Sequence, residues 1–279
     1  MVDNSILSEE YIKNRVEWDN LNMGKYETIQ NGYKIPNVLH YTFSSTILPI
    51  EIYKIIENNK KRCFGCHFYF YNDNDCDNFI KKYFSSSVYK AFNSINPVYG
   101  AMKADFFRYC VLYIIGGIYI DIKSYIYTPV FHLINKHDIC ILDLPRTKLE
   151  SWRSKTGATY EQWILIFSPK HPYLLEMIKQ TVEYISKKYI PKIDGYERLD
   201  TKQQILNITG PDAFAKAISK TIQNNQNNQN NQNNRDKKEL HRCIDYNKHF
   251  IICIGQSYKK MYHINNKKHY SELNQPLYK

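Results

Sequence analysis

Residues Asn96–Tyr127 read NPVYGAMKADFFRYCVLYIIGGIYIDIKSYIY, a pattern that indicates a helix, a glycine turn and a strand. Apolar residues recur at helical spacing from about Val98 to Ile115, which predicts a helix over this range. Gly116 follows and predicts a left-handed helix end, because glycine adopts a positive φ without steric cost. The residues after Gly117 alternate isoleucine with polar side chains, which predicts a strand.

Four polar side chains stand out on this helix and strand. Asp105 and Arg108 are three residues apart and therefore share one helix face. Asp121 and Lys123 share one face of the predicted strand, opposite its isoleucines. Taken alone, Asp105 and Arg108 would form an exposed ion pair that contributes well under about 1 kcal/mol. The short, fixed distance to the glycines and to Asp121 favours a functional site instead.

Helical and strand patterns alternate along the rest of the chain. We predict strands at 37–43, 67–71, 139–144, 163–168 and 250–254, and helices at 5–22, 48–61, 78–93, 171–188 and 211–222. Such alternation predicts an α/β fold with a mostly parallel sheet, whose ligand binds at the carboxyl ends of the strands. The 279 residues are enough for one large domain of this kind.

A low-complexity tract interrupts this pattern near the C-terminal end. Residues 223–234 repeat QNN four times, and such a tract cannot bury apolar surface. We therefore expect a disordered loop there, inserted into a domain that spans 35–279. Residues 1–34 are expected to form a helical arm that precedes this domain.

The net charge of +11 is unevenly distributed. Arg235–Lys279 contains ten Lys and Arg against four Asp and Glu, so this tail supplies much of the excess. A basic excess can indicate a polyanionic partner such as nucleic acid. However, no basic run alternates with aromatic residues as a groove for single-stranded nucleic acid requires. We therefore expect a solvated basic tail and no nucleic-acid partner.

The seven cysteines are odd in number and scattered, which argues against a disulfide framework. Cys63-Phe64-Gly65-Cys66-His67 matches the attachment pattern of c-type haem. The residues that follow indicate a buried strand, where His67 could not easily serve as an axial ligand. A zinc site is disfavoured because no second cysteine pair lies at ligand spacing.

The sequence carries no pattern of a membrane or secreted protein. Residues 1–14, MVDNSILSEEYIKN, lack the basic start and apolar core of a signal peptide. The longest apolar run, Val111–Ile120, is about half a membrane span and contains two glycines. We expect a soluble intracellular or cytoplasmic protein without a signal peptide or transmembrane helix.

The central segment, Asn96–Tyr127, resembles the signature of a known protein family. Ala104–Tyr109, ADFFRY, followed by Gly116–Asp121, GGIYID, is similar to the signature of glycosyltransferase family 32. This family contains sugar transferases with a DXD motif, including yeast-type alpha-1,6-mannosyltransferases and capsular polysaccharide transferases. Weaker matches follow in the family's order and extend the resemblance over about 34–265. They are Ile35–His40, Pro169–Pro172 with Lys170 where glycine is usual, Thr209–Pro211 and Tyr262–His263.

The resemblance implies a GT-A-like, Rossmann-like fold with helices on both faces of the sheet. It also implies retaining transfer of a hexose from a UDP- or GDP-sugar to a hydroxyl of a glycan or glycoprotein. The implied catalytic residues are Asp105, which would bond donor hydroxyls, Arg108, which would face the sugar or diphosphate, and Asp121, the first DXD aspartate.

The resemblance further implies a set of residues that bind the donor or its nucleotide. They are His40, Tyr41, Thr42, Lys103, Tyr119, Lys123, Thr209 and Gly210. A buried His40 that only bonds the backbone is a competing interpretation. On the acceptor side, Glu161 or Gln162 replaces an asparagine of the family.

The second DXD aspartate is replaced by Lys123, which leaves the metal question open. In one hypothesis Asp121 and a C-terminal group such as His263 or Asn265 still bind Mn²⁺ or Mg²⁺ weakly. In another, Lys123 and Arg108 replace the metal and contact the diphosphate directly. A third is that transfer has been lost, which would leave a sugar-nucleotide-binding protein. A nucleic-acid-binding module, suggested by the charge, is a further alternative.

Overall fold

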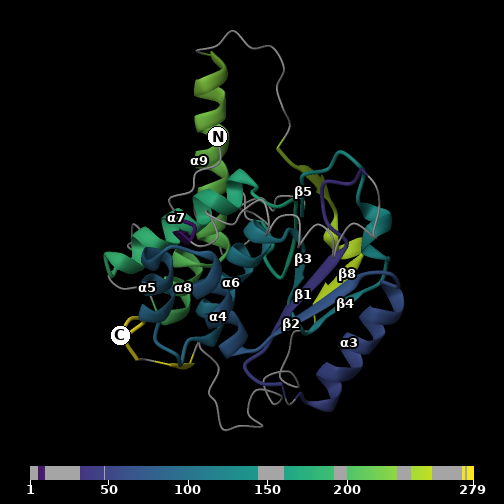
Figure 1. Cartoon of the computed structure of the whole chain (residues 1–279), viewed down its shortest axis with the longest axis horizontal. Helices are drawn as coiled ribbons and strands as arrows, with labels where there is room; N and C mark the ends of the chain where they lie inside the picture. Colours follow the sequence, from purple (N-terminus) through teal and green to yellow (C-terminus); the bar gives the residue numbers. More distant parts are fainter. Residues whose placement is uncertain are drawn as a thin grey trace.

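Within the residues that the structure describes, a sheet of six strands in the order β2-β1-β3-β6-β5-β7 forms the centre of this computed structural model (Figure 1). The strands are β1 (Val38–Thr42), β2 (His67–Tyr71), β3 (Gly117–Ile120), β5 (Cys140–Asp143), β6 (Ile164–Phe167) and β7 (Arg242–Ile244). β1 is parallel to β2 and β3, and β5 is parallel to β7, whereas β6 is antiparallel to both of its neighbours. The mostly parallel sheet is therefore confirmed.

The structure describes residues 6–9, 32–46, 48–143, 160–191, 200–230, 240–252, 272–273 and 275–279.

Further elements lie on both sides of this sheet, as the sequence predicts (Figure 1). One side holds α4 (Asp73–Tyr83), α5 (Ser86–Ser94), α6 (Gly100–Ile114), α7 (Pro172–Ser186), α8 (Thr201–Ile208) and α9 (Pro211–Asn230). The other side holds α3 (Ile50–Arg62) and a small antiparallel sheet of β4 (Ser124–Ile126) and β8 (Phe250–Ile252). The α/β class, with helices on both faces of a mostly parallel sheet, is therefore confirmed.

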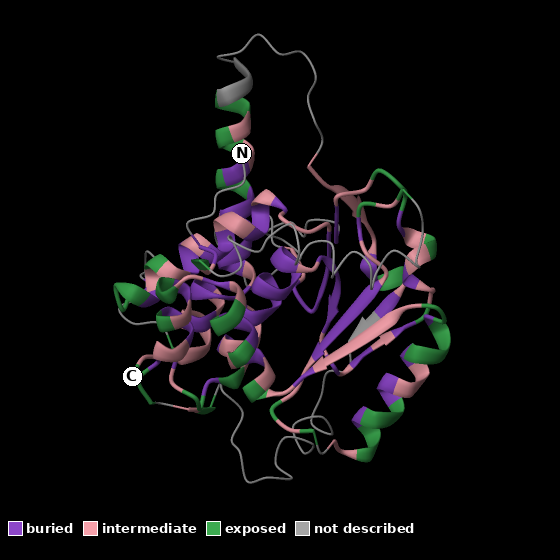
Figure 2. Ribbon diagram, in the orientation of Figure 1, coloured by how far each residue is buried: buried purple, intermediate pink, exposed green. Residues whose placement is uncertain are grey.

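Each central strand contributes side chains alternately to two apolar cores. In β3, Ile118 and Ile120 lie in the core beside α3, whereas Tyr119 lies in the core beneath the helices of the opposite side. The strand period of two residues produces this alternation. The inner strands β1, β3, β5 and β6 are accordingly almost wholly buried, whereas the edge strands β2 and β7 are mostly half-buried and the outer surface of α3 is exposed (Figure 2). Each large apolar side chain buried in this way stabilises the fold by about 1.5–3 kcal/mol.

The turn between α6 and β3 requires both of its glycines. Gly116 has φ +73° and Gly117 has φ +95°, so both occupy conformations that other residues rarely adopt. A Cβ atom on Gly116 would lie 2.6 Å from Pro169 Cδ, and one on Gly117 would lie 2.6 Å from the carbonyl oxygen of Val38. The predicted left-handed end of the helix is confirmed. Lys170, in the position where the related family has glycine, also has a positive φ of 59°.

Residues 78–93, predicted as one helix, are divided between α4 and α5. The first of these helices begins earlier than predicted, because Asn72, directly after β2, caps α4. Its side-chain oxygen accepts hydrogen bonds from the backbone N–H groups of Asn74 and Asp75, at 2.9 and 3.0 Å. The Asp75 carboxylate accepts from the Asn72 N–H in return, which completes a capping box.

The strand that follows the glycines is shorter than predicted. β3 ends at Ile120, and the Ser124 N–H donates to the Asp121 carbonyl oxygen at 2.8 Å, which closes a turn before β4. Asp121 and Lys123 therefore do not share a strand face, and that prediction is wrong. Asp121 instead occupies the first position beyond the carboxyl end of a central strand, where ligands of α/β proteins bind.

At the C-terminal side, α9 continues to Asn230, eight residues beyond its predicted end at Ile222. Residues 223–230, which were expected to form a loop, are thus helical, and residues 231–234 lie outside the described residues. The arm at 1–34 also lies largely outside them, so the division into arm and domain stays a prediction. In the described part of the chain, no helix has the length and apolar character needed to cross a membrane.

Candidate functional site

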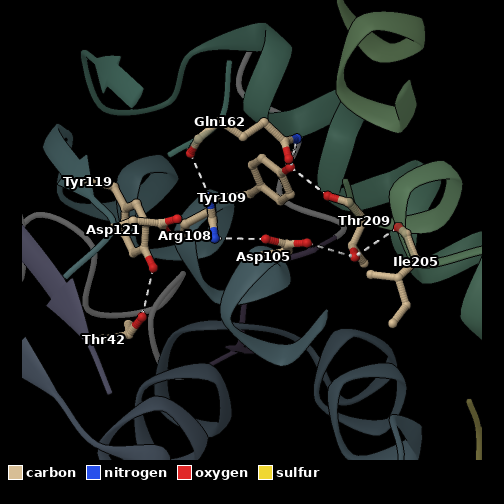
Figure 3. Close-up of polar contacts among 9 residues, drawn as sticks. All are labelled: Thr42, Asp105, Arg108, Tyr109, Tyr119, Asp121, Gln162, Ile205 and Thr209. Carbon is tan, nitrogen blue, oxygen red and sulfur yellow. Dashed lines mark hydrogen bonds and ion pairs between the residues drawn. The ribbon is translucent and has the colours of Figure 1, made fainter. Parts of the chain in front are cut away.

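Arg108 lies at the centre of a buried polar group next to the carboxyl end of β3 (Figure 3). Its Nη2 atom is 2.7 Å from Asp105 Oδ1 and 3.2 Å from Asp121 Oδ1. Asp105 and Arg108 come from successive turns of α6, and the glycine turn after that helix returns the chain so that Asp121 reaches them. The three residues predicted as catalytic therefore lie together.

Further contacts fix the orientation of the Arg108 guanidinium. Nη1 donates to the backbone oxygen of Gln162 at 2.6 Å, and the guanidinium carbon lies 4.6 Å from the centre of the Tyr119 ring. A cation at this distance from an aromatic face is attracted by the ring. Tyr119 is fixed in turn by a hydrogen bond of 2.7 Å between its hydroxyl and Thr42 Oγ1. Thr42 and Tyr119, predicted donor-binding residues, thus adjoin the predicted catalytic residues.

The second Asp105 oxygen connects the group to the end of α8 (Figure 3). Thr209 Oγ1 donates to Asp105 Oδ2 at 3.3 Å, and the Thr209 carbonyl oxygen accepts from the Tyr109 hydroxyl at 2.7 Å. Gln162 Nε2 donates to the same Tyr109 hydroxyl. Gly210 allows the close chain path here, because a Cβ atom would lie 2.5 Å from Leu206 Cα. Both predicted residues of this segment therefore contribute to the group: Thr209 bonds Asp105, and Gly210 permits the chain path that places Thr209 there.

Burial and neighbouring charges determine the protonation of the group. Desolvation raises the pKa of Asp105 from 3.8 to about 6, although Arg108 and Thr209 oppose this shift. Burial opposes the charge on Arg108, but Tyr119, Asp105 and Asp121 together raise the Arg108 pKa above its ordinary value. Arg108 therefore remains a cation, and Asp105 changes charge within an accessible pH range.

We expect Asp105→Asn to become more stable relative to the wild type as the pH rises from 4 to 7. The folded protein binds the Asp105 proton more tightly than the unfolded chain, so wild-type stability falls as pH rises from 3.8 through about 6. Asparagine does not ionise, so the difference in free energy of unfolding should change by about 2 kcal/mol over this window. Urea unfolding of both proteins at each pH measures it. A difference that is constant with pH would contradict the raised pKa.

His40 does not join this group. Its ring is fully buried, with Nε2 donating to the Gly116 carbonyl oxygen at 2.9 Å and Nδ1 3.3 Å from the Tyr71 hydroxyl. Burial lowers the pKa of His40 to about 4, so the ring is neutral near pH 7. Both ring nitrogens have partners within the fold, as in the interpretation of a buried His40 that bonds the backbone, and His40 holds the glycine turn in place.

Two other predicted donor-binding residues also lie elsewhere. Tyr41 is 1% exposed in the core beside α3, where its hydroxyl accepts from Asn59 Nδ2 at 3.3 Å. Lys103 leaves α6 on the side away from Arg108, and its Nζ lies 4.5 Å from the centre of the Phe92 ring of α5. Residues 103 and 105 point in nearly opposite directions on a helix, which the linear motif did not reveal.

The predicted metal ligands are not brought together in the described residues. Asp121 supplies one carboxylate, which faces the Arg108 cation, and His263 lies outside the described residues. In the described ranges, no three or more His, Cys, Asp or Glu side chains are grouped as a metal site requires. Lys123 is partly exposed in the turn after β3. The described donor set alone does not fit a divalent cation.

Sequence reasoning missed the roles of Tyr109 and Gln162. Gln162 is 5% exposed, and it contacts the group through both its backbone oxygen and its side chain. Tyr109 is fully buried and connects Gln162 to Thr209. The position of Tyr109 next to Arg108 in the sequence was a weak indication that Tyr109 belongs to the site. No such indication exists for Gln162, because its approach to Arg108 depends on how β6 pairs with β3.

Comparison with known proteins agrees with the family resemblance found in the sequence. Residues 25–139 match the family model described as the glycosyltransferase sugar-binding region containing DXD motif. This range includes Asp105, Arg108 and Asp121, and the resemblance to glycosyltransferase family 32 is confirmed. In this chain the DXD motif reads Asp121-Ile122-Lys123.

Individual relatives are distant. A glycosyltransferase of Acanthamoeba polyphaga mimivirus is 28% identical over 216 residues, which are 76% of this chain and 75% of that protein. The initiation-specific alpha-1,6-mannosyltransferase of Candida albicans is 27% identical, over 54% of this chain and 43% of that protein. Mannosyl phosphorylinositol ceramide synthase of Saccharomyces cerevisiae is 28% identical, over 56% and 38%. The chain thus spans less than half the length of these two fungal relatives. Among solved structures, PaToxG glycosyltransferase aligns with a TM-score of 0.47 at 12% identity, over 77% of this chain and 78% of that chain.

Proposed function

We propose that this chain transfers a hexose with retention from a UDP- or GDP-sugar to a glycan or protein-linked hydroxyl. The proposal starts from the match of residues 25–139 to a glycosyltransferase sugar-binding region that contains a DXD motif. The observation that carries the proposal is the position of Arg108 between Asp105 and Asp121 beside the carboxyl end of β3. Two fungal relatives are named for mannosyl transfer, so mannose is the first sugar to test.

The three residues differ in accessibility, and we assign their roles accordingly. The side chain of Asp121 is 25% exposed, that of Asp105 is 15% exposed and that of Arg108 is 7% exposed. Asp121 is therefore the group that meets the donor. Arg108 supplies a fixed positive charge next to it, while both Asp105 oxygens already have partners in Arg108 and Thr209. Asp105 thus acts mainly by positioning Arg108, a narrower role than direct bonding of donor hydroxyls.

The reaction that we propose breaks the bond between the anomeric carbon and the diphosphate oxygen. The acceptor hydroxyl oxygen forms the new bond on the same face of the sugar, and its proton passes to the leaving diphosphate. Negative charge develops on that diphosphate, and pre-positioned cations stabilise it without reorganisation. Arg108 is one such cation because its contacts hold it in a single orientation. Lys123, two residues beyond Asp121, is the candidate for a second.

A bound divalent metal would supply the same stabilisation as a Lewis acid. Asp121 is the described residue that would hold it, together with His263 outside the described residues. Because the described donor set does not fit a cation by itself, we assign no step to a metal. Weak dependence on Mn²⁺ or Mg²⁺ and replacement of the metal by Lys123 and Arg108 remain the two hypotheses to separate.

Binding of the sugar nucleotide without transfer is a second candidate function. The substitution of Lys123 for the second DXD aspartate favours it, because a protonated lysine cannot be a metal ligand. This alternative requires the same donor contacts as the enzyme. It differs in predicting that bound donor is neither hydrolysed nor transferred.

A thermal-shift panel of UDP- and GDP-sugars, each with Mn²⁺ or with EDTA, tests the proposal. The correct donor at about 100 times its Kd should add about 2.7 kcal/mol of stability and raise Tm by about 5–10 °C. Stabilisation in EDTA that Lys123→Met abolishes would support the lysine hypothesis. Stabilisation that requires Mn²⁺ and survives in Lys123→Met would support the metal hypothesis.

Lys54→Met, on the exposed surface of α3, is the matched control and should leave the shift unchanged. Release of free sugar or transfer to an acceptor from the stabilising donor would distinguish the enzyme from the binding protein. If no sugar nucleotide raises Tm under either condition, donor binding by this site is refuted.

A further inference from the structure

The four-residue turn Cys63–Cys66 joins α3 to β2 and is not used by the proposed function. The Cys66 N–H donates to the Cys63 carbonyl oxygen at 3.1 Å, and Gly65 has φ +87°. These are the features of a type II β-turn, in which the first and last Cα atoms lie within about 7 Å of each other. Two cysteines joined by a disulfide have Cα atoms about 4.4–6.8 Å apart. The turn therefore places both cysteines at a separation that a disulfide can span.

The two thiols also face each other. The neighbouring thiol is the largest cause of the pKa shift of each cysteine, which requires the Cys63 and Cys66 side chains to lie close together. The turn is anchored because the Cys63 N–H donates to the Asn59 carbonyl oxygen at 2.9 Å and Asn37 Nδ2 donates to the Gly65 carbonyl oxygen at 3.0 Å. The sulfur atoms are thus held near each other by a fixed backbone.

The two thiols differ in their access to solvent. Cys63 is 2% exposed, whereas Cys66 is partly exposed and follows Phe64, which is 97% exposed, and Gly65, which is also exposed. A small molecule can therefore reach Cys66 but not Cys63. Their mutual contact lowers the pKa of the Cys63 thiol and, together with burial, raises the pKa of the Cys66 thiol. Cys66 therefore holds the proton of the pair and must lose it before it can attack a disulfide.

We propose that Cys63 and Cys66 are a redox-active thiol pair that closes to an intramolecular disulfide by exchange with a small-molecule disulfide such as oxidised glutathione. Among the other described cysteines, Cys76, Cys110 and Cys140 are buried, and Cys243 is partly exposed on β7 outside any such turn. The pair lies at the amino end of β2, whereas Asp121 follows the carboxyl end of β3. Since β1 is parallel to both strands, the pair and the Arg108 group lie at opposite ends of the sheet.

The exchange proceeds in two balanced steps. The Cys66 sulfur, after losing its proton, attacks one sulfur of the small disulfide, whose S–S bond breaks as the mixed disulfide on Cys66 forms. The Cys63 thiolate then attacks the Cys66 sulfur, which releases the second small thiol. In total the two protein thiols lose two electrons and two protons, and one small disulfide is reduced to two thiols. Exposure makes Cys66 the first sulfur to react, and contact makes Cys63 the resolving one.

Mass spectrometry after incubation of the folded chain of 279 residues with mixtures of oxidised and reduced glutathione tests the proposal. Remaining thiols are blocked with N-ethylmaleimide before digestion. The wild type should yield a peptide that contains a Cys63–Cys66 disulfide and little glutathione adduct. Cys63→Ser should instead accumulate the mixed disulfide at Cys66, because the resolving sulfur is absent. In Cys66→Ser, modification of Cys63 should be slower than that of wild-type Cys66 by at least about tenfold, because the remaining thiol is buried.

Cys243→Ser, which alters a partly exposed cysteine on the edge strand β7, is the control and should leave formation of the 63–66 disulfide unchanged. Thermal melting of each variant establishes that it is folded, and Cys63→Ala replaces Cys63→Ser if the buried hydroxyl prevents folding. A wild-type protein that retains a stable glutathione adduct on Cys66, or that keeps both thiols reduced under oxidising mixtures, would overturn the proposal. The wild-type result alone therefore decides whether the redox proposal stands.

Discussion

Asp121→Asn is expected to lower turnover by about two to three orders of magnitude while leaving the protein folded. Asparagine keeps the shape of the side chain but removes the negative charge that, in our proposal, meets the donor. Arg108 retains Asp105 and the Gln162 backbone oxygen as partners, so the cation is not left unpaired. The free energy of unfolding should therefore change by less than about 1 kcal/mol. Single-turnover transfer with the donor found in the thermal-shift panel measures the activity, and urea unfolding measures the stability.

Asp245→Asn provides a matched control for this experiment. Asp245 is also a partly exposed aspartate, with 31% of its side chain accessible, but it caps a short 3-10 helix at Tyr246–Lys248 and pairs with Lys248. Its replacement should leave turnover within about twofold of the wild type. Full activity in Asp121→Asn, with the donor bound normally, would remove Asp121 from the catalytic site.

The core of the fold could be predicted from sequence because its signals are local. β2 was predicted with its observed bounds, His67–Tyr71, and the glycine turn after α6 was predicted from two adjacent residues. Local spacing also predicted that Asp105 and Arg108 share a helix face and that Asp121 follows soon after. These residues meet because a helix and the strand after it pack directly against each other, so few long-range contacts had to be inferred.

The errors concern residues whose environment is set by distant segments. The motif around His40 and Tyr41 gave no indication that one ring would bond Gly116 and the other would lie beneath α3. Gln162 reaches Arg108 because β6 is antiparallel to β3, and single-sequence patterns do not determine strand pairing. The shortened β3 has a similar cause, since β4 pairs with β8 from more than 100 residues later in the chain.

Arg108→Met is expected to be the most damaging single substitution in the site. Methionine fills a similar apolar volume but leaves Asp105, and in part Asp121, without the buried cation that pairs with them. Removing one partner of a buried ion pair costs about 3–5 kcal/mol, so the free energy of unfolding should fall by that amount. Transfer should fall below detection because the fixed positive charge beside Asp121 is lost. Urea unfolding and single-turnover transfer measure the two effects.

The double variant Asp105→Asn/Arg108→Met separates these two effects. If the unpaired Asp105 carboxylate causes the instability, its neutralisation should restore at least about 1–2 kcal/mol relative to Arg108→Met alone. Activity should not return, because nothing in the double variant replaces the cation. Recovery of stability without activity would assign Arg108 a role in transfer beyond holding the fold together. A double variant no more stable than Arg108→Met would mean that lost packing and the Gln162 contact, rather than the Asp105 charge, account for the loss.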